Sequence, residues 1–312
     1  MIPRDPSLSL VASVEDDRTL LDEAVHAYGI KGNTTISVCL PARNEEETIG
    51  AIVESIRVHL MESIPLVDEL IVLDDNSSDA TARVAHDAGA RVVPEKKILP
   101  TVGSGSGKGN VLWKSLYACH GDIICWLDAD VRNFSPSFVN RLVMPLLEYS
   151  DLALTKGYYR RPLEEKPSGG GRVTELMARP LLSLLFPKLA DVVQPLAGEY
   201  AGRRDVLETV PFVQGWGVEI GLLLDITHRN GRESISQVDL GTREHRNRSL
   251  SELSEQALAI LVTVLRRAGI AEIPDSMIEL CRFDENHQPA IAEVEVRERP
   301  PMITIEEYKT LA

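Results

Sequence analysis

The chain has 312 residues, of which 44% are hydrophobic and 26% are charged, and its formal net charge is -14 at pH 7. A chain of this length and composition can bury a full core, which argues against a disordered protein. The acidic balance argues against a nucleic-acid-binding protein, whose surface is usually broad and basic, although a small cationic pocket for a phosphorylated substrate can sit on an acidic protein.

In chain order, hydrophobic periodicity predicts strands and helices that alternate through the first half of the chain. The predicted elements are a helix at 18–28, a strand at 36–41, a helix at 45–60, a strand at 69–73, a helix at 79–88, a strand at 90–93, a helix at 108–119, a strand at 122–127, a helix at 135–148 and a strand at 152–158. This alternation is typical of βαβ units around a mainly parallel sheet, so we predict an α/β fold.

The pattern changes after residue 160. A Gly-rich loop at 167–171 precedes a helical stretch, a basic cluster lies near the end of 211–248, and 251–268 is predicted to be an amphipathic helix. We therefore expect four parts. These are an N-terminal extension at 1–34, an α/β half at 35–160, a second half with a C-terminal helix at 161–280, and a polar tail at 281–312.

The four cysteines and the apolar stretches bear on where the protein works. No two cysteines form a Cys-x-x-Cys pair, so neither a zinc site nor a dithiol motif is indicated, and the thiols suit a reducing compartment. The first residues lack the apolar stretch of a signal peptide, and no apolar run approaches the roughly 20 residues that span a bilayer. We expect a cytoplasmic protein without a membrane span.

An Asp-Ala-Asp triplet, Asp128 to Asp130, follows the predicted strand at 122–127. Alternate residues of a strand point to the same side, so the two carboxylates are expected to converge. A cation relieves their repulsion, and Mg²⁺ is commonly held by one or two carboxylates together with substrate phosphates. Solvated loop aspartates are the alternative, but the apolar strand that leads into them favours a metal site.

Polar clusters also follow the first two strands of the α/β half. Glu45 and Glu46 lie where the next helix begins, so a first-turn role beside the helix dipole is one interpretation, and contact of Glu45 with a nucleotide is the other. After the second strand, Asp74 and Asp75 are placed for a nucleoside, whereas a serine at 77 or 78 could simply cap the following helix. Ligands of open α/β sheets bind at these strand ends.

Two Gly-rich loops precede predicted helices and are candidates for phosphate binding. The loop at 103–109 matches neither a Walker A nor a G-x-G-x-x-G pattern, so it is either a flexible loop or a phosphate cradle with Lys108 as its point charge. In the loop at 168–174, backbone amides, Arg172 and Thr174 suit a phosphate or carboxylate, because arginine grips such groups bidentately. The alternative there is a helix start with a surface arginine.

The basic cluster at 243–248 contains His245. Such a cluster is usually a solvated surface, and a lone histidine is more often structural. However, neutral imidazole also binds divalent cations, and His245 lies in the most polar stretch of the second half.

Taken together, these residues resemble the glycosyltransferases of the GT-A fold, whose recurring marks are the segment at 40–50 and the later Asp-Ala-Asp. Further stretches are similar to one narrower family, the retaining glucosyl-3-phosphoglycerate synthases. They lie at 107–109, 159–162, 169–176, 194–201, 217–223 and 243–248. The similarity covers residues 35–270, and 299–302 extends it. It implies a Rossmann-like nucleotide-sugar-binding half with a mainly parallel central sheet, followed by a C-terminal acceptor-binding region.

The resemblance also implies roles for individual residues and two substrates. UDP-glucose would be held by Pro41, Ala42, Arg43, Glu45, Asp75, Lys108 and Asp128. A Mg²⁺ or Mn²⁺ ion would be bound by Asp130 and His245, and 3-phosphoglycerate by Gly171, Arg172 and Thr174. The catalytic residues would be Asp128, Asp130, Glu219 and Lys108, with Glu219 near the transferred sugar. A homodimer is likewise implied.

The expected reaction moves glucose to the C2 hydroxyl of 3-phosphoglycerate with retention of configuration. GDP-mannose or ADP-glucose as donor stays open, as does another small phosphorylated or polyprenyl-phosphate acceptor. A sugar-1-phosphate nucleotidylyltransferase would need a Gly-rich loop directly after the first strand, where 41–44 contains no glycine. A non-catalytic sugar-nucleotide sensor is a further alternative that only turnover would exclude.

Overall fold

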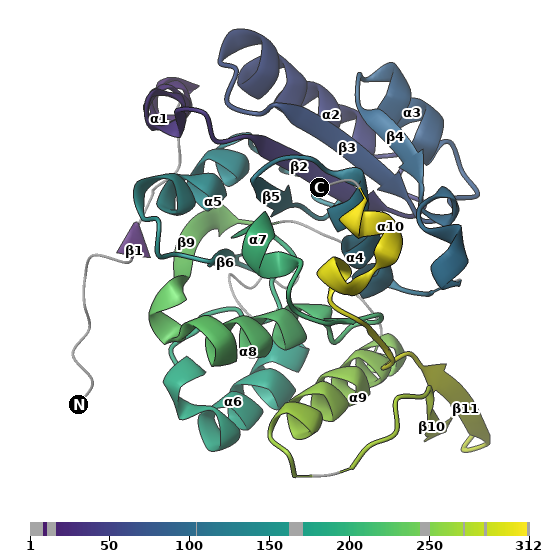
Figure 1. Ribbon diagram of the computed structural model, residues 1–312. Helices are drawn as coiled ribbons and strands as arrows, with labels where there is room; N and C mark the ends of the chain where they lie inside the picture. The colour runs from purple at the N-terminus through teal and green to yellow at the C-terminus, as the bar shows by residue number, and fades with distance from the viewer. Residues whose placement is uncertain are drawn as a thin grey trace.

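The computed structural model describes residues 9–10, 17–103, 105–161, 171–243, 250–270, 272–283 and 286–310. Its described part is built on an eight-stranded sheet with the order β1-β9-β6-β7-β5-β2-β3-β4 (Figure 1). These strands are β1 Ser9–Leu10, β2 Ile36–Ala42, β3 Glu69–Asp74, β4 Arg91–Pro94, β5 Ile123–Trp126, β6 Leu154–Arg160, β7 Tyr200–Arg203 and β9 Ile235–Thr242. Strand β7 runs antiparallel to β5 and β6, and the other described pairs in this sheet are parallel. The mainly parallel sheet expected from the sequence is confirmed.

Helices cover both faces of this sheet. They are α1 Asp17–Lys31, α2 Ile49–Arg57, α3 Thr81–Asp87, α4 Lys108–Ala118, α5 Ser137–Glu148, α6 Arg179–Leu185, α7 Arg204–Leu207, α8 Val218–Asn230, α9 Leu250–Arg267 and α10 Glu306–Lys309. One core lies between the sheet and α1, α2, α3 and α5, and a second core contains residues of α4, α6, α8 and α9. Successive strand residues serve opposite cores, as Val38 and Cys39 do in β2, because strand side chains alternate.

The predicted helix at 45–60 begins later than expected. Residues 46–48 form a turn, α2 begins at Ile49, and a π-helical turn, Val58–Ser63, continues it. Asn44 has a φ of 57°, and the Glu45 amide donates to Thr81 Oγ1 at 2.8 Å. The prediction that Glu45 and Glu46 occupy the first helical turn is therefore wrong, since a neighbouring loop binds these residues.

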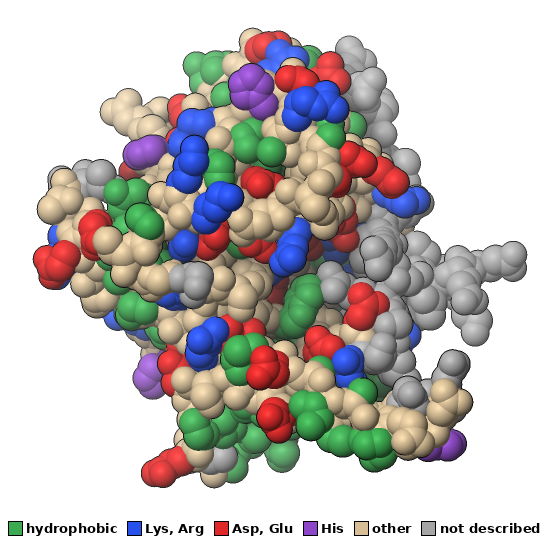
Figure 2. Space-filling model, turned by 90° about the vertical axis from the view of Figure 1, so that its right-hand side faces the viewer, with side chains coloured by type: hydrophobic (Ala, Val, Ile, Leu, Met, Phe, Trp, Pro, Cys, Tyr) green, Lys and Arg blue, Asp and Glu red, His purple; other side chains and the backbone are tan. Residues whose placement is uncertain are grey.

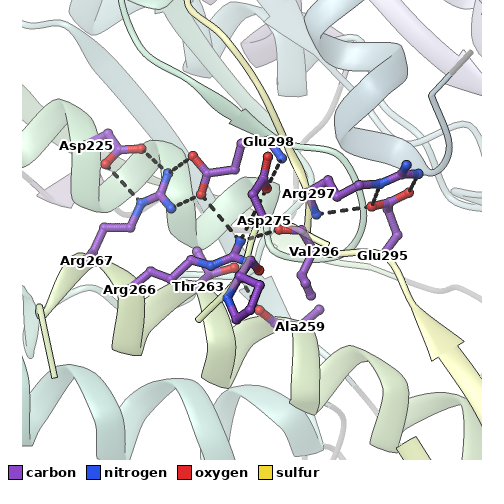
Figure 3. Close-up of polar contacts among 11 residues, drawn as sticks. Asp225, Ala259, Thr263, Arg266, Arg267, Asp275, Glu295, Val296, Arg297 and Glu298 are labelled. Carbon is purple, nitrogen blue, oxygen red and sulfur yellow. Dashed lines mark hydrogen bonds and ion pairs between the residues drawn. The ribbon is translucent and has the colours of Figure 1, made fainter. Parts of the chain in front are cut away.

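The C-terminal tail, which shows little pattern in the sequence, contains a hairpin and a short strand. The hairpin of β10 Ile278–Phe283 and β11 Pro289–Val294 lies beside α9 (Figure 1), and β12 Glu298–Arg299 pairs with β8 Phe212–Val213. Figure 3 shows Arg267 of α9 between Asp225 of α8 and Glu298 of β12. Arg267 thus ties the tail to α9 and α9 to α8.

The segment around β12, residues 295–302, also holds the Gly-rich loop that precedes α4. The buried Arg299 donates to Asn110 Oδ1 at 2.9 Å and to the carbonyls of Val102 and Gly103 at 2.8 and 3.0 Å. The Trp113 indole donates to the carbonyl of Pro300 at 2.7 Å. Residues 295–302 therefore form a strap, and we use this name for them below.

Strands from both 35–160 and 161–280 join the one large sheet, and the domain boundaries expected from the sequence stay predictions. Within the described ranges, no helix combines the length and the apolar character that crossing a membrane requires. On the face drawn in Figure 2, basic and acidic side chains are interspersed rather than gathered into a basic surface.

Candidate active site

The carboxyl ends of β2, β3 and β5 meet α4 around a cavity of about 360 Å³. Its lining residues are Pro41, Ala42, Arg43, Glu45, Asp75, Gly107, Lys108, Val111, Asp128, Ala129, Asp130 and Trp216. Every residue that the sequence predicted for donor binding is among them. Their binding roles stay predictions, but the fold brings them to one place, at the sheet edge where open α/β proteins bind ligands.

The two aspartates that follow β5 are held by cations of this chain. Lys108 Nζ lies 2.5 Å from Asp128 Oδ1, and Arg243 Nη2 lies 2.8 Å from Asp128 Oδ2 and 2.7 Å from Asp130 Oδ1. Burial would raise the pKa of Asp128, but Lys108 and then Arg243 outweigh it and hold that pKa well below its usual range. Asp128 is therefore ionised at neutral pH.

Lys108 also connects this pair to α8. Its Nζ lies 2.8 Å from Glu219 Oε1, in the first turn of that helix. Burial opposes the charged ammonium, but Asp128 and then Glu219 raise the pKa of Lys108 well above its ordinary value. Four predicted catalytic residues, Asp128, Asp130, Glu219 and Lys108, therefore lie together, with Lys108 as a permanent positive charge at their centre.

Close contact between backbones explains the glycines beside Lys108. Gly107 has a φ of 78°, which favours glycine, and it immediately precedes α4. A Cβ at Gly109 would overlap the carbonyl oxygen of Val213 in β8. The Gly-rich loop lets α4 begin against β8, and this placement directs Lys108 toward Asp128.

The loops after β2 and β3 lock together beside the cavity. The Asn44 amide donates to Ser77 Oγ at 3.0 Å, and Asn44 Oδ1 accepts from the Ser78 amide at 2.8 Å. Neither serine caps α3, so the capping alternative is wrong. Arg43 Nη1 lies 3.7 Å from Asp75 Oδ2, yet burial raises the pKa of Asp75 more strongly than Arg43 lowers it.

Of the predicted acceptor residues, Gly171 lies near Arg161 and Thr174. Gly171 has a φ of 75°, and a Cβ built there would be 3.9 Å from Arg161 Nη1 and from Thr174 Cβ. Arg161 Nη2 donates to the Tyr159 hydroxyl at 2.6 Å, and that hydroxyl accepts from Arg243 Nη1 at 3.2 Å. Arg172 precedes the π-helical turn Thr174–Ala178. The predicted metal ligand, His245, lies outside the described residues.

Two buried polar side chains belong to this region but were not predicted as site residues. Glu199 is completely buried and lies 3.0 Å from Arg243 Nε. Lys156 Nζ donates to the carbonyl of Ala197 at 3.0 Å. Lys156 lies in no local pattern that indicates a site, whereas Glu199 belongs to the stretch at 194–201 that resembles the family in sequence. Both reach the site only after β6 and β7 pair in the sheet.

The donor set of the described residues fits a divalent metal ion. Within the described ranges, Asp130 Oδ2 is the one oxygen of the two aspartates that has no cationic partner, since Lys108 and Arg243 take the other three. No described cluster of three or more His, Cys, Asp or Glu residues could complete a metal site. Carboxylate oxygen suits Mg²⁺ and Mn²⁺, and Mg²⁺ commonly needs only one or two carboxylates when phosphates complete its shell.

Gly198 should be required for activity because it lies against Asp128. A Cβ at this position would collide with both carboxylate oxygens of Asp128. We expect Gly198→Ala to lower kcat/KM about 100-fold, because small displacements of reacting groups have effects of this size. Steady-state kinetics would test this. Gly29→Ala is the control, since a Cβ there meets nothing within 4 Å, and activity of G198A close to wild type would contradict the placement of Asp128.

Lys156 should make stability depend on alkaline pH. Burial lowers the pKa of Lys156 from 10.5 to about 8. Between these values the unfolded chain binds more protons than the folded protein, so stability should rise with pH across this window, by up to about 3 kcal/mol. Urea unfolding at pH 7, 9 and 10.5 would measure it. Lys156→Met should lack this rise, and parallel pH profiles for both proteins would refute the expectation.

Comparison with known proteins places this geometry in a family. The model of the family described as "Glycosyl transferase family 2" matches residues 37–210. The glucosyl-3-phosphoglycerate synthase of Mycolicibacterium smegmatis is 48% identical over 279 residues, which cover 88% of this chain and 91% of that protein. The glucosyl-3-phosphoglycerate synthase of Petrotoga mobilis is 46% identical over 290 residues, which cover 89% of this chain and 89% of that protein.

Solved structures agree with the sequence comparison. The crystal structure of glucosyl-3-phosphoglycerate synthase from Mycobacterium tuberculosis in complex with Mn²⁺, UDP-glucose and phosphoglyceric acid has a TM-score of 0.83 at 43% identity, covering 95% of this chain and 97% of that one. The same enzyme with Mg²⁺ and UDP also has a TM-score of 0.83. The expected GT-A-like fold is confirmed, and this chain belongs to glycosyltransferase family 2 and, within it, to the glucosyl-3-phosphoglycerate synthases.

Proposed function

We propose that this protein transfers glucose from UDP-glucose to the C2 hydroxyl of 3-phosphoglycerate in a reaction that depends on Mg²⁺ or Mn²⁺. The observation that carries the proposal is the grouping of Lys108, Asp128, Asp130 and Glu219 beside the cavity lined by the predicted donor residues. One Mycobacterium tuberculosis complex holds Mn²⁺, UDP-glucose and phosphoglyceric acid, and another holds Mg²⁺ and UDP, in an enzyme 43% identical to this chain.

The donor occupies the cavity with its nucleoside between the loops after β2 and β3, where Asp75 and Glu45 lie. Lys108, charged and fixed by Asp128 and Glu219, faces the diphosphate side. Asp130 and His245 would hold the divalent ion, which stabilises the negative charge that develops on the departing diphosphate. Lys108 adds a second, permanent positive charge for the same purpose.

The acceptor binds through its phosphate and carboxylate to Gly171, Arg172 and Thr174. An arginine can grip either group with two parallel hydrogen bonds, which fixes orientation as well as position. Holding the C2 hydroxyl against the anomeric carbon raises its effective concentration. The bond from that carbon to the UDP oxygen breaks, the bond to the C2 oxygen forms, and the hydroxyl proton leaves with UDP. Retention of configuration stays a prediction that NMR of the product would check.

The test is to incubate the purified protein with Mg²⁺, 3-phosphoglycerate and either UDP-glucose, GDP-mannose or ADP-glucose, and to measure release of the nucleoside diphosphate. We expect release with UDP-glucose that requires the acceptor and stops with EDTA. Faster release with GDP-mannose would replace the donor in the proposal. Release that does not need the acceptor would indicate hydrolysis and a different acceptor, and no release with any donor would refute the transferase function.

The four cysteines are free thiols in the structure, which supports the further proposal that the protein works in the reducing cytoplasm. The expected homodimer also stays a proposal. Light scattering coupled to size-exclusion chromatography would give the mass to compare with twice the 34.4 kDa of one chain.

A further inference from the structure

Arg243 has a position that the reaction outlined above does not use. One nitrogen, Nη2, lies 2.8 Å from Asp128 Oδ2 and 2.7 Å from Asp130 Oδ1. The guanidinium therefore bridges the two carboxylates and fixes the distance between them. Lys108 takes Asp128 Oδ1, so both oxygens of Asp128 are engaged, whereas Asp130 keeps Oδ2 without a cationic partner among the described residues.

The remaining nitrogens of Arg243 are anchored on the side away from the aspartates. Its Nη1 donates to the Tyr159 hydroxyl at 3.2 Å, and its carbon Cζ lies 5.4 Å from the centre of the Tyr159 ring. Its Nε lies 3.0 Å from Glu199 Oε1 in a charge–charge contact without hydrogen-bond geometry. Glu199 is completely buried, and the Arg243 side chain is only 4% exposed.

This anchoring distinguishes two roles for Arg243. A guanidinium that merely stands in for the metal ion would have to leave when the ion binds. Arg243 cannot leave without stranding the buried carboxylate of Glu199, because a buried charge needs a partner. Arg243 also contacts only Oδ1 of Asp130. A guanidinium that occupied the place of the ion would be expected to contact Oδ2 as well.

We propose that Arg243 is a positioning residue for the metal ion: its two contacts with Asp128 and Asp130 hold these carboxylates so that Asp130 Oδ2 faces the ion. Glu199 and Tyr159 hold Arg243 in turn, and they form the outer layer of the same site. Outer partners of this kind orient metal ligands and raise metal affinity. The inference rests on the proposed function, since it concerns the divalent ion of that reaction.

The experiment is isothermal titration calorimetry of the full chain with Mn²⁺ in the presence of UDP, with UDP alone as a second titration. Arg243→Gln should weaken Mn²⁺ binding about 10- to 100-fold, the range found for such outer residues, and leave the affinity for UDP without metal within a few-fold. Arg243→Lys should recover only part of the Mn²⁺ affinity, because one ammonium cannot reproduce the planar contacts.

A matched control is Arg232→Gln. Two nitrogens of Arg232 donate to one carboxylate, that of Asp191, at 3.1 and 2.7 Å. Neither residue lines the cavity. This variant should bind Mn²⁺ as the wild type does. Thermal unfolding without metal checks that each variant is folded. If R243Q is not folded, the Mn²⁺ affinity of R243K tests the proposal in its place.

The outcomes separate this inference from the proposed function. If the wild type binds no Mn²⁺ with UDP, the proposed metal-dependent reaction fails. If the wild type binds Mn²⁺ and the folded Arg243 variants bind it equally well, Arg243 has no positioning role. If the variants bind Mn²⁺ more tightly, Arg243 competes with the ion and the inference is overturned.

Discussion

Asp130→Asn is expected to lower kcat/KM for glucosyl transfer by about 10³-fold, the size of effect seen when charge stabilisation at a reacting centre is removed. The reason is the bonding of the two aspartates. Lys108 and Arg243 pair with three of their four oxygens. No cation among the described residues pairs with the fourth, Asp130 Oδ2, so this oxygen can bind a metal ion. An amide oxygen keeps the shape but not the charge. Release of UDP with saturating Mg²⁺ and 3-phosphoglycerate would measure the loss.

Asp191→Asn provides the control for this prediction, because Asp191 is an exposed aspartate that also pairs with an arginine, Arg232. Its activity should match the wild type. Raising Mn²⁺ into the millimolar range should recover part of the D130N activity if the defect is weak metal binding. Activity of D130N within tenfold of the wild type, in the assay with saturating Mg²⁺, would show that the metal is bound elsewhere.

Lys108→Met should reduce both stability and activity. The Lys108 side chain is 16% exposed and lies between Asp128 and Glu219, so its removal leaves two partly buried carboxylates without their common partner. Breaking a buried ion pair from one side costs about 3 kcal/mol or more. Loss of the fixed positive charge that we propose faces the diphosphate should also lower kcat about 10²- to 10³-fold. Urea unfolding and steady-state kinetics would measure the two effects separately.

The double variant Lys108→Met with Glu219→Gln distinguishes structure from chemistry at this position. Removing the Glu219 charge together with Lys108 should restore much of the stability, because one unpaired carboxylate disappears. Activity should stay below that of Glu219→Gln alone, since the positive charge is still missing. If the double variant regains activity along with stability, Lys108 serves only to hold the helices together, and its role toward the donor is disproved.

The parts of the fold that the sequence predicts correctly depend on local patterns. Strands β2, β3 and β5 are apolar runs buried on both faces, and the polar clusters after them mark the edge where the cavity lies. The late start of α2 could not be predicted, because Thr81, the first residue of α3, and Asp79, in the loop before it, bind the amides of Glu45 and Glu46. Local sequence favours a longer helix there, and the tertiary contact overrides it.

Arg243 shows the same limit at the site. In the sequence it belongs to a basic cluster of the kind that is usually solvated, and no spacing rule connects it to Asp128, which lies 115 residues away. Its role becomes visible only when β9, which ends at Thr242, lies beside β6 and brings Arg243 to the carboxyl end of β5. The resemblance to a family named residues that the fold gathers at the cavity, whereas the contacts of Arg243 with Glu199 and Tyr159 are seen only in the structure.

The strap at 295–302 has a consequence for the order of folding. Its Arg299 binds Asn110 across 189 residues of chain, and Pro300 accepts from Trp113 across 187. Contacts that close such long loops are entropically costly and form slowly, whereas the neighbouring strands β2 and β3 can pair early. In a refolding experiment, recovery of secondary structure by circular dichroism should therefore precede recovery of UDP binding. The donor site would be among the last parts of the molecule to acquire its native structure.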